Sequence, residues 1–358
     1  MKLTEIDRNF SAAGIGDRTL AFFDAMAAPA VLSGFPWYDG NGPLFRLPEA
    51  LLPRLEPGVG TLTFHTSGGM IRFRTDAVAM AIDAELYLPS DMSHMPRNGS
   101  AGFDFYLGSG VDKAYYNSAM PDQGRERLTF MAAEGLEPGV MREWTVYLPL
   151  YGGVRRVRIG VTPGSTVAPP SPFFRPEPVV FYGSSITQGG CASRTGNSFT
   201  NLLCRWFDVN QVNLGFSGCG RGEAVLAAAI ATLPMSVFVL DYDHNAQTPE
   251  ELEQTHEPFF RIIRERRPDL PVIMISRCDS AFTPDAVRRR EIIRRTYDRA
   301  VGGGDRKVWY IDGSTLFAGP DRDSCTVDRI HPNDLGFYRM ATVIRPILQE
   351  ALAAAAVK

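Results

Sequence analysis

The second half of the chain alternates short apolar runs with longer amphipathic ones, and this alternation restricts the possible folds most. Regular alternation of strands and helices predicts a parallel sheet with helices on both faces. Chemistry in such sheets gathers at the carboxyl ends of the strands. The predicted strands are residues 178–182, 211–214, 236–240, 272–276 and 308–311, and the predicted helices are residues 198–207, 221–233, 249–267, 284–301 and 334–355.

The first half has a different residue pattern, in which short runs of β-branched and aromatic residues are separated by Gly, Pro, Asn and Asp. This pattern predicts a β-sandwich or jelly-roll, with His65 and His94 as ordinary core or surface residues. The predicted strands are residues 60–65, 70–74, 78–88, 103–107, 127–132, 144–148 and 154–161.

A proline-rich stretch, residues 162–178, separates the two patterns, and repeated prolines sustain neither a helix nor a strand ladder. We therefore expect a β-domain over residues 1–165, a linker over residues 166–177 and an α/β domain over residues 178–358. At 358 residues the chain is long enough for two independent cores.

Composition narrows the possible partners and the compartment. A net charge of -3 argues against a nucleic-acid partner. The first ten residues carry no signal-peptide pattern, and no long apolar run predicts a membrane span, so we expect a cytoplasmic protein. The cysteines number five and lack Cys-x-x-Cys spacing, which predicts reduced thiols.

Residues 178–190 read PVVFYGSSITQGG, a buried strand that runs directly into a turn and presents Ser185. A hydroxyl at the end of a strand is a candidate nucleophile. Gly-Ser-Ser is also an ordinary turn sequence, so the serine needs a base and an oxyanion hole elsewhere in the chain.

Residues 326–333 read TVDRIHPN, and Pro332 keeps His331 out of the helical region, so this segment is expected to be a loop. Asp328 and His331 can face one another across its turn. A histidine that accepts the serine proton, oriented by an acid, is what a serine nucleophile requires. The alternative is a capping aspartate beside a surface histidine.

Turns after the second and third predicted strands supply candidates for an oxyanion hole. Gly218 lies in NLGFSGCGRGE, where the lack of a Cβ lets a backbone N–H approach an oxyanion. Asn245 lies in DYDHNAQ and offers a side-chain amide. In the same turn Asp241, Asp243 and His244 could instead be metal ligands.

The segments GSSITQGG, NLGFSG, DYDHNA and VDRIHPN resemble, in order and context, the four sequence blocks of the SGNH (GDSL-type) hydrolase family. The resemblance implies a flavodoxin-like α/β fold with no metal or cofactor. It implies Ser185 as nucleophile, His331 as base and Asp328 as its partner. The implied oxyanion donors are the Ser185 and Gly218 N–H groups and the Asn245 amide.

The chain departs from the family pattern at Ser184, where an aspartate is common, and at Asp243, where a glycine is usual. Residues 102–108 and 147–161 look like the β-sandwich that precedes the catalytic domain in one branch of the family, and the GSSITQGG form is typical of that branch. The α/β-hydrolase elbow fits less well, because it needs glycine where Thr187 stands.

The resemblance implies a serine esterase. A β-sandwich ahead of a hydrolase resembles a carbohydrate-binding module, which suggests short-chain, first of all acetyl, esters of carbohydrates or other polyols as substrates. Two alternatives stay open: an acyltransferase that uses the same site with an alcohol or amine acceptor, and an inactive glycan-binding protein. Charged residues that follow or flank the strand ends could line the substrate cleft or form surface salt bridges, namely Arg194, Arg221, Glu223, Arg277 and Asp279. The oligomeric state is not predicted.

Overall fold

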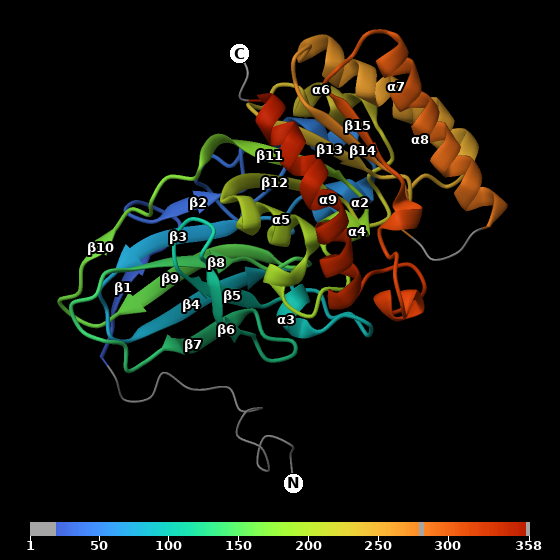
Figure 1. The fold of residues 1–358 in the computed structure, drawn as a ribbon. Helices are drawn as coiled ribbons and strands as arrows, with labels where there is room; N and C mark the ends of the chain where they lie inside the picture. The colour runs from blue at the N-terminus through green and yellow to red at the C-terminus, as the bar shows by residue number, and fades with distance from the viewer. Residues whose placement is uncertain (1–18, 279–282, 356–358) are drawn as a thin grey trace.

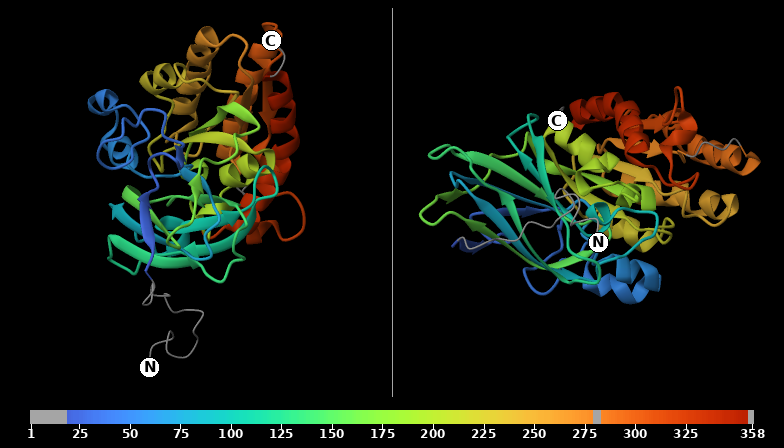
Figure 2. Two further views of the ribbon diagram at one scale, coloured as in Figure 1. Left: turned by 90° about the vertical axis from the view of Figure 1, so that its left-hand side faces the viewer. Right: turned by 90° about the horizontal axis from the view of Figure 1, so that it is seen from below.

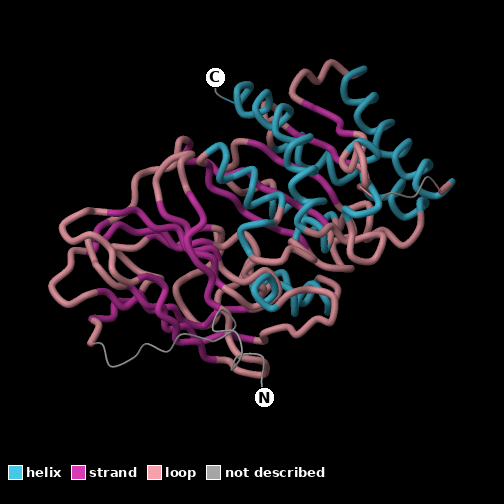
Figure 3. The backbone as a smooth tube through the Cα atoms, turned by 60° about the horizontal axis from the view of Figure 1, so that its bottom comes forward, coloured by secondary structure: helices cyan, strands magenta, loops and turns pink. Residues whose placement is uncertain are grey.

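The computed structural model describes residues 19–278 and 283–355, and it places a β-rich half against an α/β half (Figure 1). In Figure 3 most of the strands gather on one side and most of the helices on the other. The two views in Figure 2 show the halves in broad contact rather than joined only by a connecting segment. Within the described ranges, no helix is both long and apolar enough to cross a membrane.

The β-rich half is built from two antiparallel sheets that enclose a shared apolar core. Ile82 and Val157 from one sheet and Phe73 and Trp144 from the other are buried in it. The first sheet has the order β1 (Ala21–Asp24), β9 (Gly153–Val161), β4 (Met80–Tyr87), β7 (Arg127–Ala133). The second has the order β10 (Val167–Ala168), β3 (Met70–Thr75), β8 (Arg142–Tyr147), β5 (Phe103–Leu107), β6 (Ala114–Ala119), and β2 (Val31–Ser33) also pairs with β3.

The α/β half contains a parallel sheet whose strand order, 2-1-3-4-5 in chain order within this half, is that of flavodoxin-like folds. This confirms the predicted fold class. The sheet runs β12 (Val209–Gly215), β11 (Arg175–Gly183), β13 (Val237–Asp241), β14 (Val272–Ile275), β15 (Val308–Ile311).

Both faces of this sheet are covered, because side chains alternate across a strand. Val179 and Phe181 of β11 pack on one face with α5 (Phe199–Phe207) and α9 (Asp334–Ala355). Val180 and Tyr182 pack on the other face. That face is covered by α6 (Ala224–Ile230), α7 (Pro249–Arg266) and α8 (Pro284–Gly302). The remaining short helices are η2 (Glu49–Arg54), α2 (Pro57–Leu62), α3 (Arg97–Ser100), α4 (Ser185–Gln188), η3 (Thr195–Asn197), η4 (Gly313–Thr315) and η5 (Arg322–Cys325).

The strand predicted over residues 60–65 is wrong, because this segment lies in helix α2 and the turn that follows it. Pro57 occupies the first turn of the helix, where its missing N–H is tolerated. The Thr63 N–H then donates to the Val59 carbonyl, so the backbone bonds stay local. The predicted linker also holds structure, since β10 pairs with β3 and β11 begins at Arg175. The domain boundaries themselves stay a prediction.

A buried ion pair joins the two halves. Asp104 of β5 is fully buried, and its Oδ2 accepts hydrogen bonds from Arg194 Nη1 at 3.0 Å and the Gly196 N–H at 2.8 Å. The Tyr106 hydroxyl lies 2.7 Å from the same guanidinium, and Tyr115 stacks beneath it at 3.9 Å. A carboxylate in this position holds the segment after the candidate nucleophile against the β-domain.

Replacing Asp104 by alanine is expected to lower the free energy of unfolding by about 3 kcal/mol, because it leaves the Arg194 cation partly buried without its partner. Chemical denaturation measures the change. Asp83→Ala is the control, since its pair with Arg158 is more exposed and is expected to contribute less than about 1 kcal/mol. Equal losses in the two variants would contradict the interpretation.

Candidate active site

Ser185 lies where β11 turns sharply into helix α4. A Cβ on Gly183 would stand 2.0 Å from Thr187 Oγ1 and 2.4 Å from the Asp241 carbonyl, so only glycine fits at that position. Ser184 then caps α4, with its side-chain oxygen accepting the Ile186 N–H at 3.2 Å. Serine and aspartate are comparable helix caps, which explains why Ser184 can replace the more common aspartate.

The structure brings Ser185, His331 and Asp328 together although 146 positions separate the serine from the histidine. Ser185 Oγ lies 2.9 Å from His331 Nε2, and His331 Nδ1 lies 2.6 Å from Asp328 Oδ2. The histidine loop is held beside the serine because the Pro332 carbonyl accepts the Cys191 N–H at 3.1 Å. This hydrogen-bonded chain can move a proton from the hydroxyl to the imidazole.

The Asp328 carboxylate is held in its charged form. Burial alone would raise its pKa, but hydrogen bonds from the N–H groups of His331 and Ile330 and from the His331 ring outweigh burial and lower the pKa. The contacts therefore stabilise the folded loop at pH values above the ordinary carboxyl pKa. This stabilisation is lost as the pH falls through the lowered value.

The backbone N–H groups of Ser185 and Gly218 have no hydrogen-bond acceptor within the described parts of the chain. Gly218 has a φ of +69°, a conformation that favours glycine. The neighbouring N–H groups are already used, because that of Ser217 donates to Gln188 Oε1 at 3.0 Å and that of Cys219 donates to the Phe216 carbonyl. Unpaired N–H groups at this place are suited to binding an oxyanion.

Asn245 lies beside the same loop, but its amide is directed at the loop itself. Its Nδ2 donates to the Phe216 carbonyl at 2.8 Å and to the Gly220 carbonyl at 3.0 Å. Donation to a developing oxyanion would require one of these bonds to be given up, because the amide has two hydrogens. The role of Asn245 as an oxyanion donor stays a prediction.

The predicted cleft-lining residues have other contacts. Arg194 belongs to the interface described above. Arg221 donates to the Gly218 carbonyl at 3.2 Å and pairs with Glu56 at 3.3 Å, and Glu223 accepts the Tyr182 hydroxyl at 2.7 Å. The backbone N–H of Arg277 donates to Asp243. Asp279 lies outside the described residues, and the lining role of the set stays a prediction.

The alternative metal site is not supported. Asp241 Oδ2 accepts the Thr187 hydroxyl at 2.9 Å, while Asp243 Oδ2 accepts the Arg277 N–H. Burial and repulsion from Asp243 raise the pKa of Asp241 well above its ordinary value, which disfavours the ionised form that a metal ligand needs. Among the described residues, the group of three or more potential metal ligands whose ligand atoms lie within 4.8 Å of one another is His94, Asp328 and His331. Asp241, Asp243 and His244 do not form such a group.

His94, which the sequence suggested to be an ordinary core or surface residue, lies beside His331 in the structure. It lies in the loop before α3 of the β-rich half, and its ring centroid is 5.9 Å from that of His331. The side chain is exposed. A single histidine between two proline-flanked turns carries no signal that would have linked it to residues of the other half.

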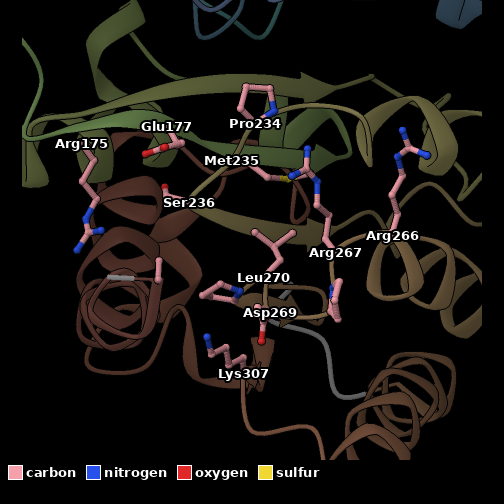
Figure 4. A pocket seen from close by; sticks show the side chains of 13 residues that line it. Arg175, Glu177, Pro234, Met235, Ser236, Arg266, Arg267, Asp269, Leu270 and Lys307 are labelled. Atoms are coloured by element: carbon pink, nitrogen blue, oxygen red, sulfur yellow. The ribbon is translucent and has the colours of Figure 1, made fainter. Parts of the chain in front are cut away.

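A prominent pocket lies at the amino-terminal ends of the parallel strands, opposite the end that carries Ser185 (Figure 4). Arg175, Ser236, Leu270 and Lys307 are among its lining residues. Figure 4 shows the labelled basic side chains pointing in different directions rather than toward one centre. Ligands of open α/β sheets bind at the carboxyl ends of the strands, so this pocket is not the candidate active site.

Comparison with known proteins agrees with this geometry. Residues 176–349 match the GDSL-like Lipase/Acylhydrolase family, and residues 20–167 match the N-terminus of SGNH-hydro-type esterases. The chain belongs to the SGNH (GDSL-type) hydrolases, in the branch with an N-terminal β-domain, and these enzymes are carboxylic ester hydrolases. No curated protein sequence matches the chain.

Solved structures share the architecture over nearly the whole chain. A protein from Bacteroides ovatus described as a GDSL-like lipase has a TM-score of 0.84 at 26% identity, covering 94% of this chain and 98% of that one. The salicylyl-acyltransferase SsfX3 from a tetracycline biosynthetic pathway has a TM-score of 0.76 at 21% sequence identity, and the match covers 92% of this chain and 97% of that one. A family two carbohydrate esterase from Clostridium thermocellum, in complex with cellohexaose, has a TM-score of 0.64 at 14% sequence identity, and the match covers 91% of this chain and 99% of that one.

Replacing Asp328 by asparagine is expected to slow labelling of the protein by a fluorophosphonate probe by roughly 10² to 10⁴, because the amide favours the wrong imidazole tautomer. The labelling rate is read from gels over time. Asp323→Asn, an exposed position before the same loop, is the control and should label at the wild-type rate. Wild-type labelling of Asp328→Asn would remove Asp328 from the proton-transfer chain.

Proposed function

We propose that this chain is a serine esterase that removes short acyl groups, acetyl first, from carbohydrate or polyol esters through an acyl-enzyme on Ser185. The observation that carries the proposal is the continuous hydrogen-bonded chain from Ser185 Oγ through His331 to Asp328. This hydrogen-bonded chain begins at Ser185, whose own N–H has no acceptor within the described residues, at the carboxyl ends of the strands, where ligands of this fold class bind.

In the proposed reaction, Ser185 Oγ attacks the ester carbonyl while His331 Nε2 accepts the hydroxyl proton. The Ser185 and Gly218 N–H groups hold the oxyanion of the tetrahedral intermediate. His331 then gives its proton to the leaving alcohol, and the acyl group stays on Ser185. A water molecule, deprotonated by His331, releases the carboxylic acid and restores the enzyme. No step uses a metal or cofactor.

The substrate class rests on fold similarity. The cellohexaose-bound esterase described above has the same architecture, and so does an acetyl xylan esterase from the rumen bacterium Butyrivibrio proteoclasticus, with a TM-score of 0.61 at 11% identity. These neighbours favour an acetylated carbohydrate. The acyltransferase neighbour keeps a second candidate open, in which an alcohol or amine replaces water in the second step.

Turnover of p-nitrophenyl acetate, butyrate and octanoate is expected to fall with acyl length and to vanish in Ser185→Ala, because the variant lacks the nucleophile. Ser184→Ala is the matched control, since it loses only the helix cap, about 1 kcal/mol of stability. Initial rates at 405 nm and fluorophosphonate labelling are measured on each protein. An active Ser185→Ala enzyme would overturn the mechanism.

Product analysis decides between the two reactions. With an acetyl donor and a sugar acceptor, an esterase is expected to release acetate, whereas a dedicated acyltransferase forms the acetylated sugar. A protein that neither turns over the esters nor reacts with the fluorophosphonate would instead be a glycan-binding protein.

The cytoplasmic location inferred from the sequence stays a prediction.

Asn245→Ala is expected to lower kcat by roughly 10² to 10³ if the amide donates to the oxyanion. KM is expected to change little, because the developing charge exists only in the transition state. Steady-state kinetics with p-nitrophenyl acetate measures both constants. An undiminished kcat would limit the oxyanion hole to the Ser185 and Gly218 N–H groups.

A further inference from the structure

Several buried side chains of the β-rich half reach into the segments that carry the candidate catalytic groups. We propose that this half is a working part of the catalytic site rather than a separable module, and that His65 is a positioning residue for the Gly218 oxyanion donor. The inference rests on the proposed function, because it assigns Gly218 to the oxyanion hole. The connection runs from His65 through Gln188 to Ser217.

The central member is Gln188, the last residue of α4, whose side chain is fully buried. Its Nε2 donates to the Leu150 carbonyl at 3.1 Å and lies 3.0 Å from His65 Nδ1. Its Oε1 accepts the Ser217 N–H at 3.0 Å. A carbonyl can only accept and an N–H can only donate, so these partners determine which end of the amide faces which.

The orientation of Gln188 in turn determines the state of His65. Because the amide nitrogen faces the ring, His65 Nδ1 must be the acceptor and therefore carries no proton. Burial and the nearby Arg46 cation lower the pKa of His65 to about 3, which keeps the imidazole neutral at working pH. A neutral histidine with an unprotonated Nδ1 is the partner that this arrangement requires.

The effect of the network falls on the oxyanion loop, because Ser217 directly precedes Gly218. Holding the Ser217 N–H against Gln188 determines how the next peptide group is turned, and hence where the Gly218 N–H points. Ser67 adds a second contact, donating its hydroxyl to the Gln188 carbonyl at 2.6 Å. Gly215 permits the close approach, since a Cβ there would lie 2.3 Å from the Gln188 nitrogen.

Two further residues of the β-rich half anchor the same region. Arg46 is fully buried and donates to the carbonyls of Asn213 at 2.9 Å and Gly215 at 2.8 Å, at the end of β12 from which the oxyanion loop leaves. Tyr151 donates its hydroxyl to the Ser185 carbonyl at 3.1 Å. The nucleophile turn and the oxyanion loop are therefore both held from the β-rich half.

The test compares His65→Leu with His65→Asn in the full chain. Leucine removes the acceptor for Gln188, whereas asparagine Oδ1 can stand near the place of Nδ1. We expect kcat for p-nitrophenyl acetate to fall about 10- to 100-fold in His65→Leu with KM little changed, since small misplacements of a transition-state donor have large effects. His65→Asn is expected to recover kcat to within about threefold of wild type.

Ile82→Ala, in the core of the β-rich half and away from the site, is the control for destabilisation alone. It should lower the melting temperature and leave kcat unchanged at temperatures where the protein is folded. If His65→Leu does not fold, Ser67→Ala takes its place, with a smaller loss of kcat expected. Ser185→Ala is assayed in parallel.

Wild-type kcat in His65→Leu together with an inactive Ser185→Ala enzyme would overturn this inference and leave the proposed function standing. Equal loss of kcat in His65→Leu and His65→Asn, or a loss in Ile82→Ala that follows the melting temperature in the same way, would also overturn it. An active Ser185→Ala enzyme would overturn the proposed function itself.

Discussion

The catalytic geometry depends on one close approach, the turn in which β11 passes into α4. Gly183 is packed so tightly against Thr187 and the Asp241 carbonyl that no side chain fits there. This contact places Ser185 at the carboxyl end of β11, with its N–H unpaired and its hydroxyl within reach of His331. The capping serine, the histidine loop and the oxyanion loop are all arranged around that turn.

The two halves of the molecule are joined by polar contacts that lie in the interior. The Asp104–Arg194 pair secures the segment after the nucleophile. Arg46 and Tyr151 donate to backbone carbonyls around it, and His65 contacts the side-chain amide of Gln188. Buried polar groups that satisfy one another specify a single arrangement, because an alternative packing would leave some of them unpaired. These contacts support the proposal that the two halves form one catalytic unit.

Sequence reasoning was successful where the signal is local. The βα alternation predicted the strands and helices of the second half closely, because a helix or a parallel strand buried on both faces leaves a periodic pattern. The strand predicted over residues 60–65 was wrong, because a short alternation of apolar and polar residues is weak evidence for a strand and Pro57 starts a helix just before it. Strands such as β1 and β6 were missed because their side chains are largely exposed and carry little hydrophobic pattern.

The sequence by itself determined the α/β architecture and, by motif order, the residues Ser185, Gly218, Asn245, Asp328 and His331 as one set. Only the tertiary structure decided that Asn245 donates to the oxyanion loop, that Arg194 pairs with Asp104, and that His94 and His65 lie at the site. The physical reason is distance along the chain. A contact between residues that lie far apart along the chain, for example 29 positions for Asn245 and Phe216 and 123 for His65 and Gln188, leaves no periodicity in either segment, so it is decided by tertiary packing.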